Sequence, residues 1–171
     1  MMSLVELARM FARDAHKGQL RKYTKQPYIV HPARVAQEAQ RLGLSKEAVA
    51  AGYLHDVVED CGVTLQQIRG AFGPRVCALV DGLSDMQTKA DGNRAARKEA
   101  VRQRLHGLRD AELHTLKLLD LVDNAGSIMR YDNEFGVTYV EEARQLAAVL
   151  DLGLPEAHAM LEAALNVEVP A

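Results

Sequence analysis

Tryptophan is absent from this chain of 171 residues, which contains only three phenylalanines, five tyrosines and two cysteines. Two cysteines are too few for the disulfide framework of a small secreted scaffold, and we expect Cys61 and Cys77 to be small buried hydrophobes. We find no signal peptide and no apolar run of transmembrane length, so we expect a cytoplasmic protein with no membrane partner. Because hydrophobic residues make up 48% and aromatic residues 5%, the core must consist of Leu, Val, Ala and Met.

The chain also lacks a strong excess of one charge, since its formal net charge is −2. This balance excludes the overall basic footprint of a nucleic-acid-binding protein. Charge is nevertheless uneven: seven basic and two acidic residues lie between Lys89 and Arg109, and four basic residues and no acid lie between Lys17 and Lys25. Each cluster can attract an anionic ligand or form an ordinary solvated helix face. The longer cluster contains no Phe, Tyr or Trp and the shorter one only Tyr23, too few aromatics to stack on successive bases, so we expect no nucleic-acid partner.

Helix signals dominate the sequence, and we find no strong strand pattern. Two capping boxes, Ser3–Glu6 and Thr64–Gln67, each precede residues with helical hydrophobic spacing. Asp110 can cap the most apolar helix, which should therefore be central. We predict an all-α bundle of roughly eight or more helices that forms a single domain over residues 1–171. The expected helices span about 4–17, 32–43, 46–59, 65–73, 74–84, 93–105, 111 through at least 122, 137–150 and 155–166, and 19–30 should be a loop with a short extended pair.

A histidine and an aspartate interrupt an apolar helical segment at His55 and Asp56. Such groups are costly to bury unless they are compensated, and a single cation can compensate several of them. His31, at a helix start, and Asp120, among leucines, can complete a site with them. Two imidazoles and two carboxylates favour a transition-metal ion such as manganese over calcium or magnesium, and they leave room for a water molecule. Taken alone, the His-Asp pair is also compatible with a satisfied polar group of the core.

Two more acids follow the proposed ligands at helical spacing. Glu59 lies four residues after His55, and Asp60 lies four residues after Asp56. Each can orient or deprotonate an attacking water molecule. The alternative is a charged helix end, but negative charge is unfavourable at a helix C-terminus, which favours the functional interpretation. The other histidines, His16, His106, His114 and His158, lack such acidic neighbours and are expected to be polar-face or satisfied core groups.

These motifs resemble, in their order along the chain, those of the hydrolase half of RelA/SpoT proteins. That half belongs to the HD-domain phosphohydrolases, and the resemblance is closest to the stand-alone small alarmone hydrolases. It extends from about Leu7 to Leu150. The motifs that carry it are Arg21-Lys22-Tyr23, Pro27-Tyr28-Ile29-Val30-His31-Pro32, Val35-Ala36, Leu54-His55-Asp56-Val57-Val58-Glu59-Asp60 and Lys117-Leu118-Leu119-Asp120 with Asn124.

The resemblance implies a Mn²⁺-dependent enzyme that removes the 3′-pyrophosphate of ppGpp or pppGpp and releases pyrophosphate with GDP or GTP. It also implies an assignment of roles within the site. The implied metal ligands are His31, His55, Asp56 and Asp120, the implied catalytic acids are Glu59 and Asp60, and the implied substrate contacts are Arg21 and Lys22 at the base, Asn124 in the nucleotide site and Tyr139 at the ribose.

The chain departs from the family where the 5′-phosphates are held. Gln87, Leu121 and Phe135 stand at or near positions that are basic in some or many members. Lys89, Arg94, Arg97 or Lys98 can substitute, which leaves the choice among ppGpp, pppGpp and adenosine analogues open. Two other functions also stay open: an HD-domain nucleotidase or phosphohydrolase that acts on another nucleotide, and a non-catalytic nucleotide-binding sensor.

Overall fold

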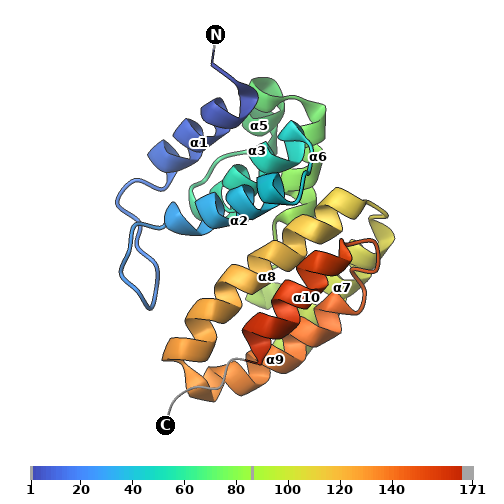
Figure 1. The fold of residues 1–171 in the computed structure, drawn as a ribbon. Coiled ribbons are helices and arrows are strands. Elements are labelled where there is room, and N and C mark those ends of the chain that lie inside the picture. The colour runs from blue at the N-terminus through green and yellow to red at the C-terminus, as the bar shows by residue number, and fades with distance from the viewer. Residues whose placement is uncertain (1, 86, 167–171) are drawn as a thin grey trace. The chain divides into compact units, whose positions relative to one another are not determined.

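The computed structural model describes residues 2–85 and 87–166, and within them the chain is helical, with one isolated antiparallel bridge between Leu20 and Pro27 (Figure 1). This confirms the predicted all-α fold. The chain forms two compact units, the first ending at Ser84 and the second beginning at Asp85. The first contains α1 (Leu4–Ala15), α2 (Val30–Arg41), α3 (Lys46–Leu54), α4 (Val57–Asp60), α5 (Leu65–Phe72) and α6 (Pro74–Leu83), and the second contains the 3-10 turn η1 (Lys89–Asp91), α7 (Arg94–Gly107), α8 (Ala111–Tyr131), α9 (Asn133–Ala147) and α10 (Pro155–Leu165).

The predicted helix starts are confirmed by their caps. The Ser3 and Thr64 hydroxyls accept the backbone N–H groups of the third helical residues, and the side chains of Glu6 and Gln67 bond back to the cap backbone. Asp110 accepts two backbone N–H groups at the start of α8. Each cap contributes about 1 kcal/mol because it satisfies donors that have no partner within the helix.

In the first unit α3 is the buried helix. All residues from Ala48 to Leu54 are buried, and α3 packs against α1, α2 and α6. The sequence predicted one continuous helix through residue 59, which is wrong: α3 ends at Leu54, a turn holds His55 and Asp56, and α4 follows. His55 and Asp56 lie at this break, and both keep right-handed helical backbone angles.

In the second unit α8 is the long apolar helix, and it packs against both α9 and α10. Its buried His114 is satisfied on both sides of the ring: Nε2 donates to the Leu105 carbonyl at 2.9 Å, and Nδ1 accepts the Leu152 N–H at 3.3 Å. This confirms the prediction of a satisfied core histidine. Helix α9 begins at Asn133, earlier than the predicted 137, because Asp132 caps it through the Phe135 N–H.

No helix within residues 2–85 and 87–166 combines the length and apolar character that crossing a membrane requires. The cytoplasmic location and the single domain over residues 1–171 stay predictions.

Candidate metal centre

Three of the four predicted metal ligands come together at one end of the buried helix of the first unit. His31 lies in the first turn of α2, where the missing N–H of Pro32 costs no helical hydrogen bond. His55 and Asp56 occupy the turn between α3 and α4. From this turn the side chains of both residues reach His31.

The ligand atoms of this triad are mutually close. Nε2 of His55 lies 3.2 Å from Nε2 of His31 and 3.2 Å from Oδ2 of Asp56. Nε2 of His31 lies 3.4 Å from the same Asp56 oxygen. Bonds of about 2.0–2.2 Å to one ion place neighbouring ligand atoms about 3.0–3.5 Å apart in octahedral or tetrahedral geometry. The separations of the triad therefore match a single shared ion.

A backbone hydrogen bond fixes the tautomer of His55. Its Nδ1 lies 2.8 Å from the Gly52 carbonyl oxygen, which can only accept, so Nδ1 must carry the proton and donate. In the neutral ring Nε2 then has a lone pair that faces the Asp56 carboxylate. This is the usual arrangement of a metal-binding histidine, whose second nitrogen donates to a backbone carbonyl.

Burial makes a cation at the triad favourable. His31 and His55 are 1% and 2% exposed, and the Asp56 side chain is 15% exposed. A lone pair and a carboxylate that face each other at 3.2 Å repel in this weakly screened environment unless a positive charge lies between them. The donor set of two imidazoles and one carboxylate suits a divalent transition metal. The group can therefore hold a divalent ion.

Gly52 sets the spacing between α2, which carries His31, and α3, which His55 follows. A Cβ atom at this position would lie 3.0 Å from Cα and 3.2 Å from N of Ala36 on α2. Both are backbone atoms and cannot rotate away. Glycine at 52 thus permits the close approach of α2 and α3, and its carbonyl also orients His55. A glycine inside a helical pattern was the available sequence signal for this role.

Tyr28 is a contact of the triad that the sequence reasoning did not assign to the site. Its hydroxyl donates to Oδ2 of Asp56 at 2.8 Å, the oxygen that faces both histidines. Its ring packs edge-on against His31, with centroids 5.9 Å apart. Tyr28 therefore fixes the carboxylate. The sequence signals for it were its place three residues before His31 and its presence in the motif that contains His31.

We expect Tyr28→Phe to lower the affinity for a divalent ion by about 10–100-fold, because outer contacts that orient a ligand typically have this effect. The edge-on packing against His31 is retained, so thermal stability should change little. Calorimetric titration of wild type and variant with Mn²⁺ measures the change. Equal affinities would show that the Asp56 carboxylate is held without the hydroxyl.

The two predicted catalytic acids, Glu59 and Asp60, lie on α4 and are exposed. Asp60 is tethered: Nε2 of Gln19 donates to its Oδ2 at 2.9 Å. The backbone N–H of Asp60 bonds to the Asp56 carbonyl at 2.9 Å, so one turn of chain links the acid to the triad. The adjacent Cys61 is half-buried, as is Cys77, so the expectation of two fully buried cysteines is wrong. Burial and then the charges of Asp60 and Asp56 raise the pKa of the Cys61 thiol, which disfavours the nucleophilic thiolate.

The predicted base contacts, Arg21 and Lys22, lie in the loop between α1 and α2, where the expected short extended pair is present. The Arg21 guanidinium lies 5.8 Å from the centroid of the Tyr28 ring. The Lys22 ammonium donates to the Tyr23 hydroxyl at 3.0 Å. Their role in substrate binding stays a prediction.

Asp120 and Asn124 lie on α8 in the second unit. Asp120 is 8% exposed; its Oδ2 accepts from Lys117 Nζ at 2.9 Å, and its Oδ1 accepts from Asn124 Nδ2 at 2.8 Å. Asp120 and Asn124 therefore share one face of α8. Lys117 already compensates the buried charge, a partner that the sequence argument for a cation did not consider. The part of Asp120 as a fourth metal ligand stays a prediction.

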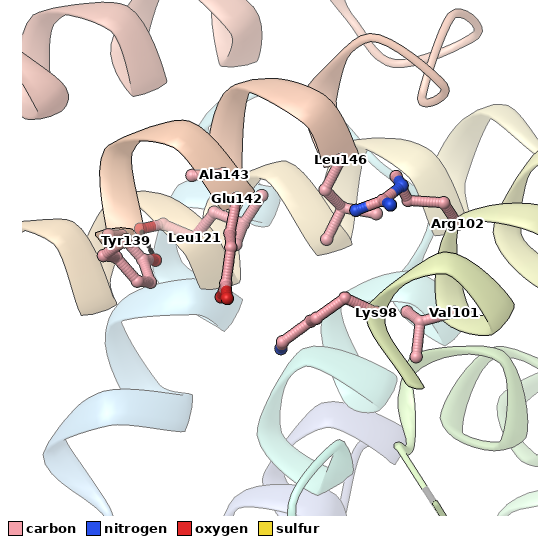
Figure 2. Close-up of a pocket in the computed structure, with 8 residues that line it drawn as sticks. All are labelled: Lys98, Val101, Arg102, Leu121, Tyr139, Glu142, Ala143 and Leu146. Atoms are coloured by element: carbon pink, nitrogen blue, oxygen red, sulfur yellow. Dashed lines mark hydrogen bonds between the residues drawn. The ribbon is translucent and has the colours of Figure 1, made fainter. Parts of the chain in front are cut away.

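Tyr139, the predicted ribose contact, is buried on α9, and its hydroxyl donates to the Leu121 carbonyl at 2.9 Å. It lines a small hollow of the second unit with about 40 Å³ of free space, which Figure 2 shows between α7 and α9. The Lys98 side chain extends into this opening toward Glu142. Glu142 is paired with Arg94, at 2.6 and 2.8 Å. The hollow is too small for a nucleotide.

Sequence comparison relates the chain to two kinds of curated protein, pyrophosphohydrolases and pyrophosphokinases. It is 36% identical over 152 residues to a guanosine-3′,5′-bis(diphosphate) 3′-pyrophosphohydrolase of Haemophilus influenzae, with 87% of this chain and 21% of the relative covered. It is 31% identical over 169 residues to a probable GTP pyrophosphokinase of Mycobacterium leprae, with 98% of this chain and 20% of the relative covered. The chain thus spans about a fifth of the length of these curated relatives.

The fold also has a solved counterpart. A structure described as a metazoan ortholog of SpoT that hydrolyses ppGpp superimposes with a TM-score of 0.82 at 21% identity, over 96% of this chain and 94% of that one. The HD-domain profile matches residues 8–150, a range that includes His31, His55, Asp56 and Asp120. With a histidine–aspartate cluster able to hold a divalent ion and a profile match over most of its length, this chain belongs to the HD-domain family.

Proposed function

We propose that this chain is a metal-dependent 3′-pyrophosphohydrolase of ppGpp and pppGpp. In the reaction, water attacks the phosphorus atom joined to the 3′-oxygen of the nucleoside. The bond between that phosphorus and the 3′-oxygen breaks, and the 3′-oxygen takes up a proton. The products are pyrophosphate and GDP from ppGpp, or pyrophosphate and GTP from pppGpp.

One observation carries this proposal: two buried imidazoles and a carboxylate face one another at 3.2–3.4 Å, with acids on the following turn. A buried cluster of three such groups is costly to form unless a cation compensates it. A cation site with an adjacent base suits the hydrolysis of a polyphosphate, because the ion activates water and the base accepts its proton.

Each residue has a proposed part in the reaction. His31, His55 and Asp56 would hold the ion, with Asp120 as a fourth ligand and Mn²⁺ as its identity. The ion would supply Lewis acidity toward a water molecule and a phosphoryl oxygen. Glu59 and Asp60 orient the water and accept its proton. The substrate contacts proposed from the resemblance are Arg21, Lys22, Asn124 and Tyr139.

The names of the relatives support an alarmone as substrate but divide on the reaction, since some are named pyrophosphohydrolases and others pyrophosphokinases. The chain covers only a fifth of each relative, so the name of a whole relative does not identify the reaction of the matching part. The triad favours hydrolysis, because the arrangement serves to activate water.

The purified protein with Mn²⁺ should release pyrophosphate stoichiometrically from ppGpp and pppGpp, as followed by separate detection of pyrophosphate, orthophosphate and nucleotide. EDTA should abolish the release, and added Mn²⁺ should restore it. Release of orthophosphate from simple nucleoside monophosphates, with alarmones untouched, would assign another phosphohydrolase activity. Tight ppGpp binding without any product in the presence of Mn²⁺ would identify a sensor and refute the enzyme.

A further inference from the structure

A chain of hydrogen bonds leads from the buried end of α1 to the exposed carboxylate of Asp60. His16 follows the last residue of α1, and its Nδ1 lies 2.7 Å from Oε1 of Gln19. The other end of the Gln19 amide, Nε2, donates to Asp60 at 2.9 Å. A carboxylate only accepts, so the amide orientation is fixed, and Oε1 must accept from a protonated Nδ1 of His16. Each member thereby determines the direction of the next bond.

Two backbone hydrogen bonds also hold Gln19 in place. Its N–H donates to the His16 carbonyl at 3.0 Å, across a turn in which Gly18 has a φ of +84°, a value that glycine adopts without strain. Its carbonyl accepts the Tyr28 N–H at 2.9 Å. These bonds fix the backbone position of Gln19 next to Tyr28, the residue that bonds to Asp56.

The same loop thus fixes two carboxylates of the proposed site. Tyr28 bonds to Asp56 and Gln19 bonds to Asp60. The His16 ring contacts both residues: it bonds to Gln19, and it stacks on the Tyr28 ring with centroids 4.7 Å apart and an interplanar angle of 30°. His16 is only 3% exposed, so its position is set by packing. An exposed aspartate samples several rotamers unless a fixed donor selects one.

We propose that His16 and Gln19 are positioning residues that hold the Asp60 carboxylate in one orientation beside the candidate metal centre. This inference rests on the proposed function, in which Asp60 accepts the proton of water. His16 supplies the N–H that orients the Gln19 amide, and Gln19 supplies the N–H that selects the Asp60 rotamer. Neither residue touches the substrate or the reacting atoms.

Two substitutions of His16 separate donation from stacking. His16→Asn retains a side-chain N–H near the position of Nδ1 but removes the ring. His16→Phe retains the stack on Tyr28 but removes the donor. Gln19→Leu removes the link itself. Cys61→Ala is the matched control, because its sulfur lies 3.2 Å from His16 Nδ1 but has no bond to Asp60.

With ppGpp and Mn²⁺, Gln19→Leu and His16→Phe should each lower kcat by about 10–100-fold while KM and Mn²⁺ affinity stay within about twofold. His16→Asn should recover most of the loss, and Cys61→Ala should behave as wild type. The double variant His16→Phe/Gln19→Leu should be no slower than Gln19→Leu, because the two residues act in series. Wild-type kcat in Gln19→Leu, or a slower His16→Asn than His16→Phe, would overturn the inference.

Crystal structures of wild type, Gln19→Leu and His16→Phe give a readout that does not need activity. The Asp60 carboxylate should adopt one rotamer in wild type and lose it in both variants. If wild type proves inert toward both alarmones, the proposed function has failed, and the Asp60 rotamer alone decides the positioning role. An unchanged rotamer in both variants would refute that role. If His16→Phe fails to fold, Gln19→Leu decides.

Discussion

Asp56→Asn is expected to lower pyrophosphate release from ppGpp by about 10²–10³-fold and to weaken Mn²⁺ binding in parallel. The carboxylate of Asp56 is the charged group of the triad, and its Oδ2 lies within 3.4 Å of both imidazoles. Asparagine keeps the shape and still accepts the Tyr28 hydroxyl, but it removes the negative charge that balances a cation. The effect should therefore exceed that of Tyr28→Phe, which leaves this charge in place.

Calorimetric Mn²⁺ titration and a pyrophosphate assay at saturating metal measure the two effects separately. The matched control is Asp14→Asn, since Asp14 is an exposed acid of the same unit that pairs with Arg13 at 2.9 Å. The control should bind Mn²⁺ and turn over as wild type does. An Asp56→Asn protein that binds Mn²⁺ with wild-type affinity would remove Asp56 from the ligand set and undermine the proposed metal centre.

Gly52→Ala is expected to destabilise the protein by about 1–3 kcal/mol, because the added methyl group overpacks a helix contact that has no room for it. The new Cβ atom would meet the Ala36 backbone at 3.0 Å, so α2 must move away from α3. A loss of this size lowers Tm by about 3–10 °C in a chain of this length. Since His31 is on α2 and His55 directly follows α3, Mn²⁺ affinity should fall as well.

The control for this variant is Gly70→Ala, on α5 of the same unit. A Cβ atom there would meet nothing within 4 Å, and the residue is helical. Alanine should be neutral or should stabilise the helix by up to about 1 kcal/mol. Thermal unfolding and Mn²⁺ titration of both variants test the pair. Equal Tm values for Gly52→Ala and Gly70→Ala would show that α2 and α3 can separate without cost.

Much of the fold was predictable from local signals in the sequence. The capping boxes at Ser3 and Thr64, and the aspartate cap before α8, mark helix starts because they satisfy N–H groups within three residues. The break between α3 and α4 was missed. Ala50 to Val58 contains no proline, and its single glycine gives only a weak local stop, so the helical sequence pattern continues through the turn.

The residues of the candidate site were likewise predictable only in part. His31, His55 and Asp56 were identified because polar groups in an apolar segment are costly without compensation. Tyr28, Gln19 and His16 were not assigned to the site, because residues of a turn or loop carry no periodicity that indicates where their side chains point. Their contacts with Asp56, Asp60 and one another depend on how the loop after α1 folds back.

The sequence by itself determined the helical class, the helix starts and the residue types able to bind a divalent ion, because capping and the cost of burying polar groups act through composition and short spacings. Only the tertiary structure decided that His31 and His55 meet at 3.2 Å, that Gly52 sets the approach of their helices, and that one loop orients both Asp56 and Asp60. Those distances join residues up to 41 positions apart, and packing between elements determines them.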